Sequence, residues 1–121
     1  MMNKGEIQEM LVEKNALINV VKELKETLAQ GYTILGVSDH LLLLDCGVKV
    51  CELFTEESFL KQQKENWEDW KDDEALQCYD FEEFLEYCVW GGGEYSDIQP
   101  MIDAYEERIE ELDGLLNESI I

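Results

Sequence analysis

The spacing of apolar residues between positions 4 and 30 is the strongest constraint on how this chain can fold. Apolar side chains recur there every three or four residues, with Lys14 as a polar interruption. That spacing places them on one face of an α-helix. Gly31 follows directly, and glycine is the residue that most often follows the last turn of a helix. The sequence therefore predicts a long amphipathic helix over residues 4–30, whose apolar face consists of Ile7, Met10, Leu17, Val21, Leu24 and Leu28.

The next segment, residues 32–54, has a shorter pattern that is typical of strands. It contains three apolar runs, at residues 32–37, 41–44 and 48–54, with short polar segments between them. Connections this short join antiparallel strands, because a parallel crossover needs about a dozen residues or more. We therefore expect a three-stranded antiparallel meander with helices covering one face of the sheet.

Two helices are predicted directly after the meander. Thr55 is a suitable N-cap for a helix over residues 56–71. Asp80 and Glu83 have the spacing of a capping box, which predicts a second, shorter helix over residues 81–90.

A last helix is expected over residues 97–116, with Ser96 or Asp97 as its N-cap and Pro100 in its first turn. The fold class is therefore α+β: a long helix, an antiparallel meander and three acidic helices. A chain of 121 residues with 45% hydrophobic content is long enough to bury a core, so we expect residues 1–121 to form one domain.

The tryptophans of the first acidic helix have two interpretations. Trp67 and Trp70 share a helical face with Phe59 and Leu60, which favours a place in the core. The alternative is that one of them lies at the centre of a contact patch, where an aromatic side chain surrounded by charge often dominates binding.

The chain is strongly acidic, and the charge is unevenly distributed. There are 29 acidic and 9 basic residues, which gives a net charge of −20. Residues 55–121 hold 21 of the acids and 4 of the bases, and therefore −17 of that charge. Long-range repulsion disfavours direct binding to nucleic acid and to anionic membranes. We therefore expect a cationic protein as partner.

The acidic residues of the second half form two clusters, and both are candidate partner-binding sites. Their repulsion within the last helix costs roughly 1 to 3 kcal/mol, and the net charge exceeds the magnitude of ~2 to 8 that keeps a small domain soluble. Plain solvation of a helical face is the alternative. Carboxylates one helical turn apart can instead imitate phosphates, and the candidate residues are Glu65, Glu68, Asp69, Asp72, Asp73, Glu74, Asp80, Glu82, Glu83, Glu86, Asp103, Glu106, Glu107 and Glu110.

The sequence contains no recognisable catalytic or metal centre. It has one histidine, His40, one arginine, Arg108, and none of the common nucleophile or phosphate-loop motifs. We therefore expect no enzyme activity, no cofactor and no bound metal. The cysteines lack the closely spaced pairs of a zinc site, so we expect reduced thiols buried in the core at Cys46, Cys51, Cys78 and Cys88.

The segment from Thr55 to Tyr87 is a capped helix followed by an acid-rich aromatic stretch, with the sequences Glu57-Ser58-Phe59-Leu60, Asn66-Trp67 and Tyr79-Asp80-Phe81-Glu82-Glu83-Phe84. Together with the order of helix, meander and acidic helices, it resembles the small acidic anti-CRISPR proteins of phages. Those proteins mimic DNA and block the RNA-guided CRISPR nuclease where it reads the PAM. The resemblance implies that the acids between Glu65 and Glu86 oppose PAM-reading arginines.

We accordingly expect a stoichiometric inhibitor in the cytoplasm of a bacterial host cell. It would block the basic nucleic-acid-binding surface of a defence nuclease, in the first place a CRISPR effector, and be a monomer or a homodimer. No membrane association is expected, because no apolar run reaches the ~18 residues of a membrane span. Two alternatives remain: an immunity protein against a cationic nuclease toxin, and a coiled-coil phage assembly or scaffolding factor, for which the heptad positions are 7, 10, 14, 17, 21, 24 and 28.

Overall fold

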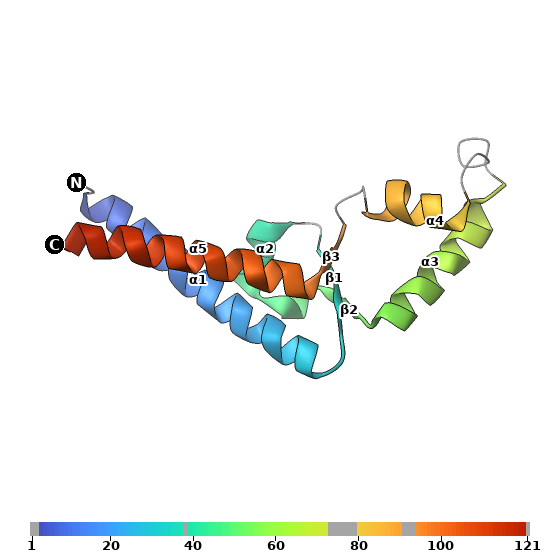
Figure 1. The fold of residues 1–121 in the computed structure, drawn as a ribbon, viewed down its shortest axis with the longest axis horizontal. Coiled ribbons are helices and arrows are strands. Elements are labelled where there is room, and N and C mark those ends of the chain that lie inside the picture. Colours follow the sequence, from blue (N-terminus) through green and yellow to red (C-terminus); the bar gives the residue numbers. More distant parts are fainter. Residues whose placement is uncertain (1–2, 38, 73–79, 91–93, 121) are drawn as a thin grey trace.

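The computed structural model describes residues 3–37, 39–72, 80–90 and 94–120. Two long helices, α1 (Lys4–Ala29) and α5 (Ile98–Ile120), lie side by side and antiparallel at one end of the molecule (Figure 1). We call this pair the hairpin, although the two helices are not consecutive in the chain. At the other end, α3 (Glu56–Trp70) packs against α4 (Phe81–Phe84). The strands lie between these two ends, so the molecule is elongated (Figure 1).

The fold is α+β with a three-stranded antiparallel sheet, as the sequence predicts, but the sheet is not the predicted meander of consecutive strands within residues 32–54. Its members are β1 (Ile34–Gly36), β2 (Glu52–Phe54) and β3 (Tyr95–Asp97), in the order β2-β1-β3. The central residue of β1, Leu35, is opposite Leu53 on one side and Ser96 on the other.

One of the three predicted strands is wrong, because residues 41–44 lie in a helix, α2 (His40–Cys46). The side chain of Asp39 accepts a hydrogen bond from the backbone nitrogen of Leu41 at 2.9 Å, which caps the first turn. Gly47 ends the helix with a φ of 80°. Four consecutive leucines have no period that distinguishes a strand from a helix, and leucine is among the better helix formers. The caps therefore decide the outcome.

The third strand of the sheet, β3, lies where the sequence predicts the start of the last helix. Ser96 and Asp97 belong to the strand, and Asp97 directly precedes α5, which starts at Ile98 and ends at Ile120 rather than at the predicted residues 97 and 116. The backbone nitrogen of Val37 donates to the carbonyl oxygen of Glu94 at 2.7 Å, and that of Ile98 donates to Thr33 at 2.9 Å. These bonds extend the pairing beyond β3, and α5 follows the strand without a loop.

The other predicted helix boundaries are close to the observed ones. Gly31 follows α1 with a φ of 100°. Thr55 forms a capping box with Ser58 at the start of α3. Asp80 caps α4 by accepting from the backbone nitrogen of Glu83 at 2.8 Å. The helix predicted for residues 81–90 continues beyond α4 as a π-helical turn, η2 (Leu85–Val89). The strand predicted for residues 48–54 is wrong in its first half, because Val48–Val50 form a 3-10 turn, η1, before β2.

The sheet separates two apolar cores, because successive residues of a strand point to opposite faces. The core next to the hairpin draws on α1, α2, β1 and α5, and includes Val20, Leu24, Leu35, Leu43, Ile98 and Ile102. The core next to α3 and α4 consists of Ile34, Phe54, Phe59, Phe84 and Val89. Trp67 packs against this second core, but Trp70 is 55% exposed, so the expectation that both tryptophans are core residues is wrong for Trp70.

Ion pairs join the two helices of the hairpin. Lys14, the polar interruption in the apolar pattern of α1, pairs with Asp113 of α5. Lys25 pairs with Glu106 at 3.3 Å. The guanidinium of Arg108 donates two hydrogen bonds to the carboxylate of Glu13, at 2.9 and 3.2 Å. These hydrogen bonds raise the pKa of Arg108 above its ordinary value. Lys14 thus contacts α5, and the heptad positions Val21, Leu24 and Leu28 pack in the core next to the hairpin. Most of the heptad positions of α1 are therefore used within this chain.

The turn after α2 yields a stability prediction. Gly47 has φ and ψ angles of 80° and −172°, which only glycine adopts easily. A Cβ atom there would also meet the carboxylate of Glu23, which accepts a hydrogen bond from the backbone nitrogen of Val48 at 3.1 Å. Gly47→Ala is expected to lower the free energy of unfolding by about 1 to 3 kcal/mol, as measured by urea denaturation.

The matched control for this variant is Gly114→Ala in α5. A Cβ atom at Gly114 would meet nothing within 4 Å. Alanine is the better helix former, so this variant is expected to raise the free energy of unfolding by about 0.5 to 1 kcal/mol. Equal effects of the two substitutions would show that the conformation of Gly47 is not required.

Candidate functional site

The structure distributes the acidic residues predicted as a partner-binding site over two separate surfaces. One group lies on α3, on α4 and in the residues that flank them, and the other lies on α5, in the hairpin (Figure 1). Asp73 and Glu74 lie outside the described residues. We call the first group the α3–α4 acidic surface, and it comprises Glu65, Glu68, Asp69, Asp72, Asp80, Glu82, Glu83 and Glu86.

The α5 group is partly used within the fold. Glu106 pairs with Lys25, and the carboxylate of Asp103 accepts a hydrogen bond from Gln99 at 3.0 Å. Glu107 and Glu110 are exposed and take part in none of the ion pairs between described residues. Two of the four predicted α5 residues therefore remain as candidates for binding a partner.

The α3–α4 acidic surface has fewer internal partners. Glu68 accepts a hydrogen bond from Lys71 at 2.7 Å, which raises the pKa of that lysine. Asp80 caps α4. Glu65, Asp69, Glu82, Glu83 and Glu86 are all exposed, and none of them is in an ion pair with another described residue. Their charge is available to a partner.

Basic residues are absent from a long stretch of sequence that includes α4, a feature that the acid count alone does not reveal. Between Asp72 and Glu107 there are 12 acidic residues and no lysine or arginine. Lys61 and Lys64 of α3, and Lys71 directly after it, therefore provide the nearest positive charge before this stretch. The ammonium of Lys64 lies 5.8 Å from the ring centre of Phe81, and that of Lys71 lies 5.5 Å from the ring of Trp67. The α4 side of the surface is thus purely acidic in sequence, whereas the α3 side is mixed.

Large aromatic side chains are exposed on the elements that carry the α3–α4 acidic surface. Trp70 is 55% exposed, Tyr87 is 61% exposed and Trp90 is 38% exposed. The ring of Trp90 still lies 5.0 Å from that of Phe59. Exposed aromatic side chains among charged ones are typical of protein-binding surfaces. For Trp70, this position agrees with the contact-patch interpretation.

A cavity of about 430 Å³ lies next to Trp70, between α3, α4, η2 and β3. The residues that line it include Gln63, Asn66, Trp70, Phe84, Glu94 and Tyr95. Gln63 is only 2% exposed, and its side-chain oxygen accepts a hydrogen bond from Asn66 at 3.3 Å. Its side-chain nitrogen has no hydrogen-bond partner among the described residues. A buried polar atom without a partner is unusual in a folded protein and calls for an explanation.

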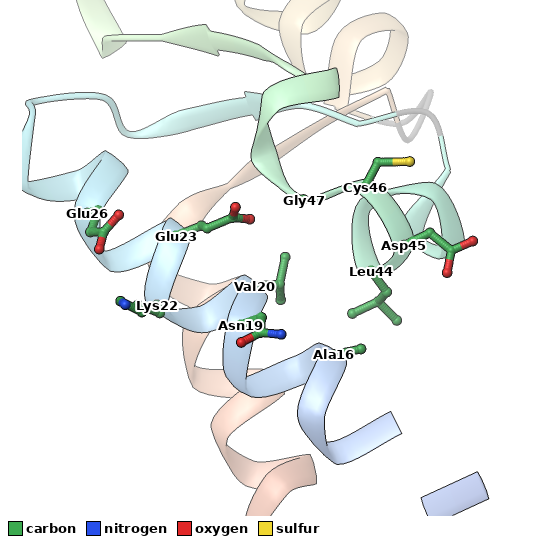
Figure 2. Close-up of a pocket in the computed structure, with 10 residues that line it drawn as sticks. All are labelled: Ala16, Asn19, Val20, Lys22, Glu23, Glu26, Leu44, Asp45, Cys46 and Gly47. Carbon is green, nitrogen blue, oxygen red and sulfur yellow. The ribbon is translucent and has the colours of Figure 1, made fainter. Parts of the chain in front are cut away.

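A second cavity, of about 440 Å³, lies between α1 and α2 and is shown in Figure 2. Its lining is polar and includes Glu23, Glu26, Asp45 and Cys46. Glu23 already has a structural role there, because it holds the backbone of the turn after Gly47. Within the described residues, no three histidine, cysteine, aspartate or glutamate side chains are placed to bind a metal ion together.

The cysteines are less buried than the sequence suggests. Cys46 and Cys51 are half-buried free thiols, and burial raises the pKa of Cys51. Cys88 is an exposed free thiol, so the expectation of a core position is wrong for it. It lies in η2. Phe84 and Val89 occupy the face of this helical segment that packs in the second core, and Cys88 lies outside that face. Cys78 lies outside the described residues.

The histidine of the chain, His40, is exposed at the start of α2. Its Nδ1 lies 3.1 Å from the hydroxyl of Tyr105 in α5. Burial raises the pKa of Tyr105, and the proximity of Cys51 adds to that shift. This contact ties α2 to the hairpin.

No protein-family model, curated protein or solved structure matches this chain. Among the described helices, none has both the length and the apolar character needed to cross a membrane. The functional argument therefore depends on the surfaces and cavities of this molecule.

The unpartnered amide of Gln63 yields a prediction about stability. Methionine has a similar shape and no polar hydrogen, so Gln63→Met removes a buried donor that nothing satisfies. It also removes the acceptor of the 3.3 Å hydrogen bond from Asn66, but that side chain is only half-buried and can donate to water instead. The variant is expected to raise the free energy of unfolding by about 1 kcal/mol, measured by urea denaturation. Gln62→Met, at the exposed neighbouring position, is the control and should change it by less than about 0.5 kcal/mol. A loss of stability in Gln63→Met would mean that the amide is satisfied in solution.

Proposed function

We propose that this protein is a stoichiometric inhibitor that binds the basic nucleic-acid-binding surface of another protein through its α3–α4 acidic surface. Carboxylates would stand in for phosphates, and the protein would compete with the nucleic acid. We place it in the bacterial cytoplasm, as a phage product that acts on a defence nuclease. An RNA-guided CRISPR effector is the first target to test, because of the resemblance in the segment from Thr55 to Tyr87.

The observation that carries this proposal is the concentration of exposed, unpaired carboxylates beside exposed aromatic side chains. Glu65, Asp69, Glu82 and Glu86 are exposed and take part in none of the ion pairs between described residues, while Trp70 and Tyr87 supply apolar area. An acidic face that served only solubility would not need exposed aromatic groups, which favour association.

The charge density of α4 and the turn that follows it is similar to that of nucleic acid. Asp80, Glu82, Glu83 and Glu86 fall within one short helical segment. At a rise of ~1.5 Å per residue, these charges span ~9 Å, or ~3 Å per charge. A DNA strand has one phosphate per ~3.4 Å of its axis. A protein groove lined with arginine and lysine would therefore meet a similar charge density.

A pair of fourfold variants tests which surface binds. The first changes the α3–α4 acidic surface: Glu65→Gln, Asp69→Asn, Glu82→Gln and Glu86→Gln. The second changes α5 and its end: Asp103→Asn, Glu107→Gln, Glu110→Gln and Glu118→Gln. Both remove the same charge, so a general effect of net charge would weaken them equally. We expect the first variant to lose at least about tenfold in its ability to displace labelled DNA from the target, and the second to remain close to the unmodified protein.

The result of that experiment can also contradict the proposal. Equal inhibition by the unmodified protein and both variants would exclude acidic mimicry. Loss of inhibition in the second variant alone would move the site to α5. Circular dichroism and thermal unfolding of each variant would establish that the fold is retained.

Salt provides an independent prediction. Binding driven by opposite charges weakens as ionic strength rises, because counterions screen both surfaces. The logarithm of the association constant for the target should therefore fall linearly with the logarithm of salt concentration, with a smaller slope for the fourfold variant of the α3–α4 acidic surface than for the α5 variant. Isothermal titration calorimetry at several salt concentrations measures both slopes. Identical slopes would show that these carboxylates do not face the target.

The two alternatives remain testable by other means. An immunity protein would bind a cationic nuclease toxin with the same surface, so the identity of the captured target separates it from a CRISPR inhibitor. An assembly factor would need a free helical face for a second chain, whereas Leu17, Val21 and Leu24 of α1 are buried in this chain. The intramolecular hairpin therefore favours the inhibitor.

A further inference from the structure

We propose that the cavity between α3, η2 and β3 binds the side chain of an arginine that the partner protein inserts. This inference rests on the proposed function, because it names the group of the cationic partner that the α3–α4 acidic surface would receive. Its basis is the chemistry of the cavity walls, which differs from that of the surrounding acidic surface.

The first observation is the buried amide of Gln63. This side chain lines the cavity and is 2% exposed, and its side-chain nitrogen has no hydrogen-bond partner among the residues described. Folding leaves such a group unsatisfied only at a cost. A ligand that hydrogen-bonds to this amide would remove that cost, so the cavity is suited to a polar ligand as well as to an apolar one.

The amide pair can present an acceptor to the cavity. In the present arrangement the Asn66 side-chain nitrogen donates to the Gln63 oxygen at 3.3 Å. Turning both terminal amides over keeps a hydrogen bond between them, with Gln63 as donor and Asn66 as acceptor. The Gln63 oxygen then occupies the position of the unpartnered nitrogen. A donor-rich ligand that reaches this atom, which is buried in the free protein, then meets an acceptor in place of a donor.

The remaining walls favour a cationic and planar donor. Glu94 contributes an exposed carboxylate at the lining of the cavity, and Trp70 and Tyr95 contribute aromatic rings. A guanidinium has five N–H donors in one plane, pairs with a carboxylate and stacks on aromatic rings. Its attraction to a tryptophan face is strongest when both are partly desolvated. Carboxylate, amide oxygen and indole together match an arginine side chain.

Two other ligands make different use of the same walls. A lysine would pair with Glu94 but has no planar group for stacking. A neutral side chain with a carbonyl group would accept from the present Gln63 nitrogen and make no use of Glu94. Comparison of these three chemistries is therefore a direct test.

The test uses the full chain and three short peptides, acetyl-Gly-Arg-Gly-amide and its lysine and citrulline counterparts. Citrulline has the shape of arginine, is neutral and carries a carbonyl oxygen. Binding is followed by the NMR signals of the Gln63 side-chain amide and the Trp70 indole. We expect the arginine peptide to bind about tenfold more tightly than either of the others. Equal binding of arginine and lysine, or tighter binding of citrulline, would overturn the assignment, and so would absence of binding by all three.

Variants of the protein add a second readout. Glu94→Gln and Gln63→Met should each weaken binding of the arginine peptide by about tenfold, whereas Glu9→Gln, which removes one exposed carboxylate on α1, should leave it unchanged. Gln63→Met is expected to be folded, and thermal unfolding checks this. Unchanged binding in both cavity variants would overturn the proposal. The rate at which the exposed thiol of Cys88, which also lines the cavity, reacts with iodoacetamide should fall when the arginine peptide is present.

The two proposals fail in distinguishable ways. If the fourfold variant of the α3–α4 acidic surface loses inhibition but Glu94→Gln and Gln63→Met inhibit normally, the proposed function stands and the arginine cavity is wrong. If the arginine peptide binds as expected but no variant affects displacement of DNA from the target, the assignment of the cavity to an arginine side chain is correct and nucleic-acid mimicry is wrong.

Discussion

The pairing of β1 with both β2 and β3 is the interaction on which the rest of this structure depends. Each strand has only three residues, too few for a sheet to be stable on its backbone hydrogen bonds alone. The sheet persists because side chains on its two faces are buried in different cores: Leu35 is 0% exposed on the hairpin side, and Ile34 is 3% exposed on the side of α3 and α4. Loss of either core would expose one face of β1, so the hairpin and the α3–α4 end are thermodynamically linked through three short strands.

That linkage explains how the chain tolerates its charge. The hairpin holds most of the ion pairs between described residues: Lys14, Lys25 and Arg108 each neutralise an acid of the neighbouring helix. The α3–α4 end has little such compensation, and repulsion among its carboxylates opposes folding by a few tenths of a kcal/mol per close pair. The aromatic core of Phe54, Phe59 and Phe84 offsets that repulsion, because buried aromatic side chains are large and pack edge to face. The charge is therefore placed on the part of the molecule with the larger aromatic core.

The sequence was informative where periodicity and capping residues agree, as in α1, α3 and α4. It failed at Leu41–Leu44, where the choice between helix and strand depends on Asp39 and Gly47, and at β3, whose three residues pair with a strand about sixty positions away. Short strands of this kind are specified by their partners, which sequence alone does not place. For the candidate site, the acids could be identified from composition, but their division into a paired α5 group and an unpaired α3–α4 group depends on Lys25 and Glu106 meeting across the hairpin. Gln63 is four residues from both Phe59 and Trp67 and therefore shares their helical face, but only packing leaves its amide without a partner.

Charge and shape contribute differently to recognition by such a surface. Exposed carboxylates attract any cationic protein and mainly increase the rate of encounter, so by themselves they discriminate poorly among basic partners. Discrimination needs a site that suits one ligand chemistry better than others, and in our proposal the carboxylate, the aromatic rings and the buried amide of the cavity together provide one. A partner that cannot fill the cavity leaves Gln63 unsatisfied, whereas one that inserts a matching side chain gains that hydrogen bond. If the cavity binds an arginine as we propose, the stability that the free protein forgoes at Gln63 contributes to the selectivity of that binding.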